Sequence, residues 1–341
     1  MTVKTKAILA ATAVGAAVLI RNLKSTRPDH SFVGQVVLIT GGSKGLGLQL
    51  AREFGSRGAR LAICARDSAE LDRARLDLEG RGYEVLPVTC DVTQEAQVDA
   101  MVREVIGRYS RVDVLVNNAG AIHVGPLEDM HAADFKTAMD VIFWGTLYPT
   151  LALLPSYRAR QSGKIVNISS IGGKVSMPHL APFSAAKFAV AGLSEGLRSE
   201  MAQHNVTVTA IFPGLLRTGS YRNAHFRGNA SEEESWFSAG ASLPGLTLSA
   251  SRAARMIVDA ARDGANERVL GAPAWTLERV HSLFPAKTME LIGTVATALL
   301  PVIGGSTRLE GSALRKLAGP ALKLLLWAGQ RTAKNLNQGA A

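Results

Sequence analysis

The fold of this chain is decided by the stretch Val37-Leu38-Ile39-Thr40-Gly41-Gly42-Ser43-Lys44-Gly45-Leu46-Gly47. It begins as an apolar run that predicts a buried strand and ends in a turn rich in glycine. Residues 48–54 follow with the apolar spacing of a helix. A strand, a glycine turn and a helix N-terminus together make an anion site, because glycine lets the backbone approach a pyrophosphate and the helix dipole favours negative charge. The alternative is a turn with a purely structural role.

Strands and helices alternate along the rest of the chain. We expect strands at 60–65, 84–90, 112–116, 165–170 and 206–212, an edge strand at 267–270, and helices at 70–78, 97–109 and 251–262. This alternation predicts an α/β fold, a Rossmann-type doubly wound parallel sheet with helices on both faces. We expect a single such domain over residues 31–272, with helical extensions at 1–30 and 273–341. Residues 219–248 are expected to form a lid, since long loops often cover ligands.

The carboxyl ends of the expected strands carry the informative polar residues, and parallel sheets bind ligands at that edge. The second strand ends in Arg66, and Lys44 lies in the glycine turn. An acid near Arg66's position would bond a ribose 2′-hydroxyl, whereas an arginine favours a 2′-phosphate. The pattern therefore predicts NADP(H) rather than NAD(H) as the cofactor. The alternative is that Arg66 is an ordinary solvated loop residue.

These motifs resemble the short-chain dehydrogenase/reductase family over roughly residues 33–272. The glycine motif, the Asn117-Asn118-Ala119-Gly120 motif and the strand ending in Ser170 agree with it in order and spacing. The resemblance also implies an adenine-contacting acid and a loop, Pro213-Gly214-x-x-x-Thr218, that closes over the nicotinamide. The implied cofactor-binding residues are Gly41, Ser43, Lys44, Gly45, Leu46, Gly47, Arg66, Asp91, Val92, Asn118, Lys187, Pro213, Gly214 and Thr218.

The family's chemistry implies four further groups, of which this sequence keeps two. A tyrosine acts as acid/base, a lysine four residues later lowers its pKa, a serine thirteen residues earlier holds the substrate oxygen, and a helix asparagine holds a water. Ser170 and Lys187 stand at the serine and lysine positions. Phe183 stands at the tyrosine position and Ile142 at the asparagine position. Both replaced groups handle protons, so proton transfer is expected to be impaired.

Two other residues are candidate proton donors. His179 lies on the loop before Phe183, and histidine is a common acid/base. Tyr221 follows the nicotinamide loop and is close enough in sequence to swing inward. Neither has a spacing that the family uses. An ordinary surface histidine and an ordinary lid aromatic are the alternatives.

The net charge of +10 is concentrated in the two tails. Residues 1–30 carry five basic residues against one acidic, residues 301–341 carry six against one, and the residues between have a net charge of only +1. We therefore expect no nucleic-acid partner and a membrane surface as the partner of both tails. The apolar run 7–20 spans about 21 Å as a helix, short of a ~30 Å hydrocarbon core. We expect a membrane-seated anchor there; a cleaved signal peptide or a helix docked on the protein are the alternatives.

The carboxyl-terminal tail continues this pattern. Residues 289–303 are largely apolar, and residues 314–327 interleave leucines with basic side chains, which suits a helix in a bilayer interface. A hydrophobic flap on the domain or on a partner subunit is the alternative. The two cysteines, Cys64 and Cys90, lie in apolar runs, which predicts buried thiols in a reducing compartment. No His or Cys cluster has metal-ligand spacing, so no metal is expected.

Two functions stay open after this reading. The first is an NADP(H)-dependent oxidoreductase acting on a lipophilic carbonyl or alcohol, membrane-associated with its catalytic domain in the cytoplasm. The second is a catalytically inactive NADP(H)-binding scaffold or regulatory subunit. Under both, the resemblance implies a homodimer formed through the helices around residues 135–155 and 184–202. Positions 142 and 183 separate the two functions, whereas the glycine motif serves both.

Overall fold

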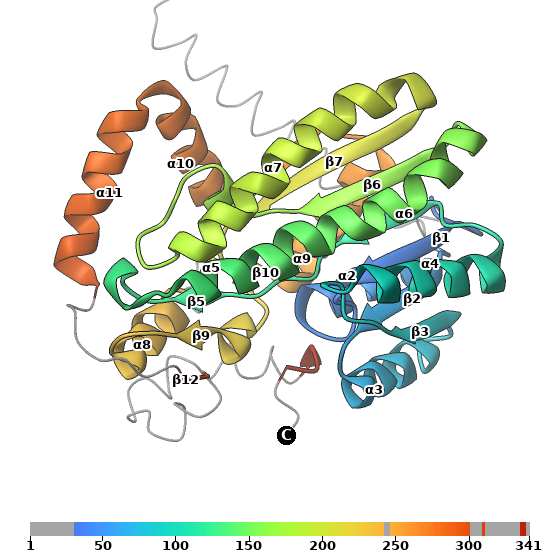
Figure 1. Cartoon of the computed structure of the whole chain (residues 1–341), viewed down its shortest axis with the longest axis horizontal. Helices are drawn as coiled ribbons and strands as arrows, with labels where there is room; N and C mark the ends of the chain where they lie inside the picture. Colours follow the sequence, from blue (N-terminus) through green and yellow to red (C-terminus); the bar gives the residue numbers. More distant parts are fainter. Residues whose placement is uncertain (1–30, 242–245, 301–308, 311–334, 339–341) are drawn as a thin grey trace, which may run out of the picture.

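A seven-stranded parallel sheet is the centre of the structure, a computed structural model that describes residues 31–241, 246–300, 309–310 and 335–338 (Figure 1). Every adjacent pair of strands in it is parallel. After β1 the strands are added toward one edge of the sheet, and from β4 on they are added toward the other edge. The carboxyl ends of the strands beside such a topological switch point form a ligand crevice. In spatial order the strands are β11 (Glu267–Leu270), β7 (Val206–Pro213), β6 (Gly163–Ile168), β4 (Val114–Asn117), β1 (Val36–Thr40), β2 (Arg60–Ala65) and β3 (Val85–Thr89).

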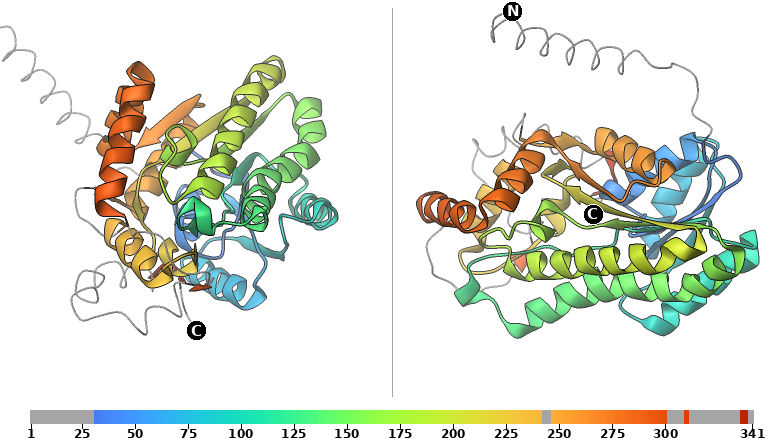
Figure 2. Two further views of the ribbon diagram at one scale, coloured as in Figure 1. Left: turned by 60° about the vertical axis from the view of Figure 1, so that its left-hand side comes forward. Right: turned by 90° about the horizontal axis from the view of Figure 1, so that it is seen from above.

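Helices cover both faces of the sheet (Figure 2). Val37 and Ile39 of β1 pack in one buried core with the first group of helices, whereas Leu38 packs in a second core with the other group. Strands buried on both faces are apolar at every position, which is why these strands read as continuous apolar runs. The first group is α2 (Gly45–Ser56), α3 (Ser68–Glu79) and α9 (Ala250–Arg262), and the second is α4 (Glu95–Tyr109), α6 (Gly145–Arg160) and α7 (Ala181–Met201).

One long helical stretch contains a wide turn. Helix α5 (Ala132–Met139) runs into the π-helical turn η2 (Asp140–Trp144) and then into α6. Within the described residues, this stretch, Ala132–Arg160, is long and apolar enough to cross a bilayer by length and composition. It also packs against α4, α7 and the strands β4 and β6. Its apolar character is therefore explained by its place in the domain core.

Shorter elements gather around the carboxyl ends of the strands. The segment expected to be a lid holds α8 (Ala230–Gly240), so it is partly helical, and two short strand pairs join it to the sheet domain. Helices α10 (Ala272–Leu283) and α11 (Pro285–Leu299) follow the last strand. The small elements are β5 (His123–Val124), η1 (Leu127–Asp129), η3 (Ile171–Gly173), η4 (Ala202–His204), β8 (Leu216–Arg217), η5 (Ser220–Asn223), β9 (His225–Phe226), β10 (Leu248–Ser249) and β12 (Leu309–Glu310).

The expected fold class is confirmed, and so is the burial of both thiols. Cys64 and Cys90 are free and buried. The expected edge strand at 267–270 does lie at one edge of the sheet. The anchor helix expected within residues 1–30 and the basic-apolar stretch 314–327 lie outside the described residues, so they remain predictions. The division into three parts also stays a prediction.

Candidate functional site

A cavity of about 1940 Å³ lies at the carboxyl ends of the strands, against the N-terminus of α2. It brings together the glycine turn, the ends of β2, β3 and β4, and the residues after β6 and β7. Ser170, Phe183 and Lys187 line the same cavity, whereas Ile142 is buried behind its wall. All the sequence-predicted cofactor residues line it: Gly41, Ser43, Lys44, Gly45, Leu46, Gly47, Arg66, Asp91, Val92, Asn118, Lys187, Pro213, Gly214 and Thr218.

The glycine turn has positions that only glycine can occupy, which leaves open space beside the backbone. Gly41 and Gly45 have positive φ angles of 63° and 57°, which side chains rarely tolerate. A Cβ on Gly47 would overlap the carbonyl oxygen of Gly41. The side-chain amide of Asn118 donates to the carbonyl oxygens of Thr40 (3.0 Å) and Gly41 (3.1 Å), so it braces the turn. The open cradle and the N–H groups of α2 fit the pyrophosphate of a dinucleotide.

The ribose end of the cavity carries both positive and negative charge. Arg66 is exposed, lines the cavity and makes no side-chain hydrogen bond or ion pair among the described residues. The Lys44 ammonium lies 2.8 Å from a carboxylate oxygen of Glu70, at the start of α3. The sequence reading counted Lys44 as a free positive charge and missed Glu70. A signal for it existed, because Glu70 lies in the first turn of the helix after Arg66, where the chain returns toward the glycine turn.

Residues 335–338, called the strap below, lie across the glycine turn. Leu336 is buried, and its carbonyl oxygen accepts a 2.8 Å hydrogen bond from the N–H of Gly45, at the start of α2. The Asn337 side-chain amide donates to the carbonyl oxygens of Ser43 (2.9 Å) and Glu70 (3.0 Å). The strap is therefore hydrogen-bonded to backbone groups of the glycine turn, which faces the predicted phosphate site.

The strap also reaches the opposite rim of the cavity. Gln338 lines the cavity, and its side-chain oxygen accepts a hydrogen bond from Asn223 in η5. Asn223 in turn accepts a hydrogen bond from Lys44. The backbone oxygen of Gln338 accepts from Arg222 at 2.9 Å. The strap thus bridges the glycine turn and the segment after the nicotinamide loop, a contact that no local sequence pattern could have indicated.

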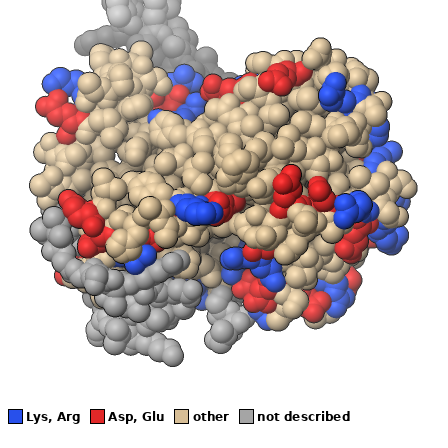
Figure 3. All heavy atoms as spheres, viewed as in Figure 1, with Lys and Arg blue, Asp and Glu red and all other residues tan. Residues whose placement is uncertain are grey.

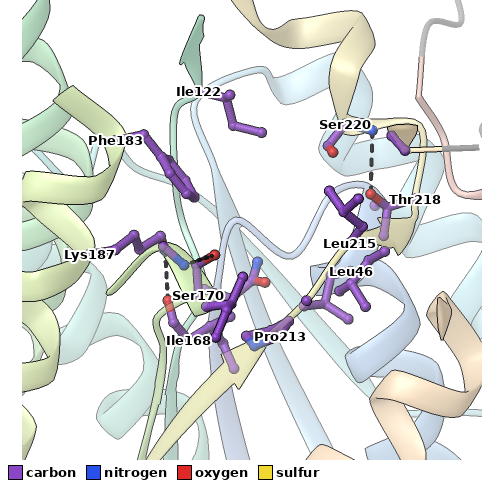
Figure 4. Close-up of a pocket in the computed structure, with 18 of the residues that line it drawn as sticks. Leu46, Ile122, Ile168, Ser170, Phe183, Lys187, Pro213, Leu215, Thr218 and Ser220 are labelled. Carbon is purple, nitrogen blue, oxygen red and sulfur yellow. Dashed lines mark hydrogen bonds between the residues drawn. The ribbon is translucent and has the colours of Figure 1, made fainter. Parts of the chain in front are cut away.

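The expected reaction centre lies deeper in the cavity (Figure 4). Lys187 projects from α7, and its ammonium donates to the carbonyl oxygen of Ile168 at 2.7 Å. Burial disfavours its charged form and lowers the pKa of Lys187 to about 8. Ser170 Oγ accepts from the N–H of Gly172 at 3.1 Å, so its own proton is available to a ligand. Phe183 faces the cavity one helical turn before Lys187, with the ammonium 5.6 Å from the ring centre.

Ile142 and Phe183 belong to one apolar cluster. Ile142 is buried in the π-helical turn η2 and clusters with Ala138, Ala186 and Val190, against which Phe183 packs. The backbone carbonyl oxygen of Ile142 accepts a 2.8 Å hydrogen bond from Thr146 Oγ1. π-helical turns occur often at functional sites, and this one adjoins the expected reaction centre although the side chain at its centre is apolar. The two positions that depart from the family pattern therefore adjoin each other in space.

Neither candidate donor lines the cavity. The His179 ring lies 2.8 Å from the buried carboxylate of Glu233 in α8, whose other oxygen accepts from Trp236 Nε1 at 2.6 Å. His179 is thus no surface histidine but part of a network that ties the loop between Ser170 and Phe183 to α8. Tyr221 is buried in the apolar cluster around β5, β9 and α8. Both side chains sit apart from the residues that line the reaction centre.

The remaining wall of the cavity is mainly apolar. Leu215 lies opposite Phe183 and Lys187, and Ile122 lies above them in the view of Figure 4. Trp236 of α8 forms part of the wall, and the Glu233 hydrogen bond fixes its ring. Helix α11 forms the outer end of the cavity with a row of aliphatic side chains, which are Leu291, Ile292, Val295 and Ala296. Such a lining suits a lipophilic ligand beside the reaction centre.

Known proteins resemble the chain throughout this domain. The model of the short chain dehydrogenase family matches residues 35–226. Dehydrogenase/reductase SDR family member 7B of Danio rerio is 35% identical over 222 residues, which are 63% of this chain and 72% of the relative. A short-chain dehydrogenase from Streptomyces avermitilis superposes with a TM-score of 0.67 at 30% identity, covering 77% of this chain and 98% of that one. A variant of actinorhodin polyketide ketoreductase, solved with NADPH, gives 0.61 at 31% identity, covering 70% and 95%.

Proposed function

The chain belongs to the short-chain dehydrogenase/reductase family of oxidoreductases, and from this premise we propose that it is an NADP(H)-dependent enzyme with impaired proton transfer. Its substrate is a lipophilic carbonyl or alcohol. The observation that carries this proposal is the cavity itself, which joins the glycine turn, Ser170 and Lys187 with Phe183 at the acid/base position. Bound there, NADP(H) supplies or accepts the hydride. The relative solved with NADPH supports the choice of a nicotinamide cofactor.

Each residue of the reaction centre has a distinct part in this proposal. Ser170 Oγ donates a hydrogen bond to the substrate oxygen and orients it. Lys187 places its positive charge beside the same region and would hold the ribose of bound NADP(H). Phe183 excludes water and holds the substrate against the opposite wall, but its ring has no proton to give. The oxygen formed on reduction must therefore take its proton from a slower source.

Turnover tests this proposal most directly. The wild type should reduce a reactive diketone slowly, because losing a positioned general acid costs about 10²–10⁴-fold in rate. Phe183→Tyr should restore part of the activity, since the Lys187 charge lowers the pKa of a new tyrosine. Adding Ile142→Asn should restore more by rebuilding the water-holding position. Phe188→Tyr is the matched control, because Phe188 is an exposed residue of the same helix.

The outcomes separate clearly. Wild-type turnover at ordinary rates, on the order of 1–10³ per second, contradicts impaired proton transfer. No gain in either Phe183 variant, with NADPH binding intact, contradicts the role given to position 183. Thermal denaturation of each variant checks that a lost activity reflects chemistry rather than unfolding.

A second candidate function is a binding protein that does not turn over. It is favoured by the apolar cluster in which Ile142 and Phe183 support each other, since such packing would stabilise the domain without serving proton transfer. Under this function NADPH binds to the wild type, and no carbonyl oxidises it above the rate of free cofactor. Calorimetric titration with NADPH beside the turnover assay decides between the two functions.

The partners follow from the same proposal. We place the protein on a membrane through its two basic tails, with the sheet domain on the cytoplasmic side. We also propose a homodimer through α6 and α7, where Leu151 and Phe188 are exposed, together with Trp144 at the end of η2. Leu151→Glu should then give a monomer in sedimentation equilibrium. A wild type that is itself monomeric contradicts the dimer.

A further inference from the structure

Helices α10 and α11 form a pair that projects from one end of the domain (Figure 2). Large apolar side chains are exposed along both helices and at the turn between them. Leu283 and Phe284, at that turn, are 73% and 61% exposed. The others are Trp275, Val280, Met289, Leu291 and Val295. Contiguous apolar surface of this kind marks an interaction site.

The same pair walls the outer end of the cavity. Leu277 of α10 and the aliphatic row of α11 line it. Leu291 and Val295 both line the cavity and are 64% and 47% exposed, so the cavity opens along α11. An exposed apolar face and an apolar opening therefore coincide on one helix.

Few charges interrupt this surface. Lys287 and Glu290 pair with each other at 2.8 Å, and the Arg279 guanidinium lies over the Trp275 ring at 5.7 Å. Glu278 is buried. Charged side chains on the face shown in Figure 3 gather toward α3 and α4 and are sparser toward α11. A tryptophan beside an arginine suits the headgroup level of a membrane, with aliphatic side chains beyond it.

We propose that the α10–α11 turn inserts into the surface of a lipid bilayer and that the cavity takes its substrate directly from the lipid. This deepens the proposed function and rests on its lipophilic substrate. The occupant is lipid rather than protein, because a partner chain or a second copy on this face would seal the opening along α11. A fluid lipid surface covers Leu283 and Phe284 and leaves the opening in contact with dissolved substrate.

An environment-sensitive dye at the turn tests the proposal in the full-length protein. NBD is attached to Leu283→Cys, since the native Cys64 and Cys90 are buried. Vesicles of phosphatidylcholine with a minority of phosphatidylserine should shift its emission to the blue, and lipids with nitroxide-labelled chains should quench it. The matched control is Leu76→Cys, an exposed leucine on α3. Its dye should report neither change, although the tails hold both proteins on the vesicles.

A second variant tests the energetic weight of the turn. Leu283→Glu/Phe284→Glu should lower the vesicle partition coefficient about tenfold, because charged groups replace apolar side chains at the insertion point. Leu76→Glu/Leu127→Glu, which changes the same charge at exposed leucines elsewhere, should leave it unchanged. These readouts need no turnover, so they stand or fall separately from the proposed chemistry.

Three results would overturn the proposal. The first is vesicle binding without any change of the dye at position 283, which would assign binding to the tails alone. The second is a blue-shifted dye before vesicles are added, which would mean that another part of the chain covers the turn. The third is a shift that depends on protein concentration rather than on lipid, which would mean that a second copy covers it.

Discussion

Phe183 and Ile142 are best understood together at the scale of single residues. Each replaces a polar group of the family pattern, and both contribute to the same apolar cluster. Restoring only the asparagine would bury an amide among aliphatic side chains, at a cost of about 1–3 kcal/mol if it finds no partner. The tyrosine variant faces the cavity and has no such cost. Activity should therefore return through position 183 first and position 142 second.

Lys187 gives the protein a pH dependence of stability. Burial lowers its pKa from 10.5 to about 8 in the folded protein, so between these values the unfolded chain binds more protons and stability rises with pH. The gain from pH 7 to pH 10 should approach roughly 3 kcal/mol, at 1.36 kcal/mol per pKa unit. Urea unfolding of the wild type and Lys187→Met at several pH values measures it. Equal pH slopes in the two proteins would contradict the buried, destabilised charge.

Glu70 should limit the preference for NADPH. Its carboxylate neutralises Lys44 and would lie near a 2′-phosphate, so Glu70→Gln should tighten NADPH binding several-fold and leave NADH nearly unchanged. Arg66→Asp should do the reverse, because it removes the exposed guanidinium and adds a carboxylate. Fluorescence titration with both cofactors measures the two ratios. Equal affinities in the wild type, or no change of ratio in Arg66→Asp, would remove the NADP preference.

The residues of the site differ in how far sequence could predict them. The glycine turn, Arg66, Asn118, Ser170 and Lys187 were predicted as site residues from their fixed positions relative to a strand end or helix start, and they line one cavity. Glu70 was missed, because its role depends on which side chain a neighbouring element presents. His179 was considered either as a proton donor or as a surface histidine, whereas a carboxylate 54 residues later in the chain holds its ring. The local sequence pattern predicts where the backbone of each element lies. Which side chains from different elements contact each other depends on the tertiary packing.

The strap makes a prediction at the scale of elements. Asn337→Ala removes one hydrogen bond to Ser43 in the glycine turn and two to α3, to the carbonyl oxygen of Glu70 and from Arg73, each worth about 0.5–1.5 kcal/mol. The strap should then leave the turn about tenfold more often, and NADPH should associate correspondingly faster in stopped-flow fluorescence. Asn335→Ala is the matched control, since that side chain is exposed in the same segment. An unchanged or slower association in Asn337→Ala would show that the strap does not obstruct the cofactor.

Strands were predicted better than the elements around the site. The range expected for the second strand, 60–65, and that for the edge strand, 267–270, agree with the structure because runs buried on both faces have sharp polar ends. Helix α8 was missed within the expected lid, since its run Ser231-Glu232-Glu233-Glu234-Ser235 reads as solvated although Glu233 and Glu234 are buried. The π-helical turn η2 has no local signal either. Packing against the sheet, rather than propensity, decides these cases.

The tails make their prediction at the scale of the whole molecule. Residues 1–30 and 301–341 hold +9 of the net charge of +10, and basic residues near an anionic surface contribute about 1 kcal/mol each. Full-length protein should therefore pellet with anionic vesicles at low salt and release progressively as salt screens the attraction. Removing residues 1–30 should weaken this binding without changing NADPH affinity. Full-length protein that stays soluble at low salt would refute it.

During synthesis of the chain, the glycine turn is made long before the strap that contacts it. Asn337 meets Ser43 across 294 residues of chain, and ribosomes add about 5–20 residues per second. For roughly 15–60 s after the glycine turn is made, its residues exist without the segment that later crosses them. A nascent chain whose sheet has already formed thus passes through a stage in which no strap residue lies against the glycine turn. The strap is made afterwards, so a nucleotide that binds during translation does not have to displace the strap, whereas one that binds the finished protein does.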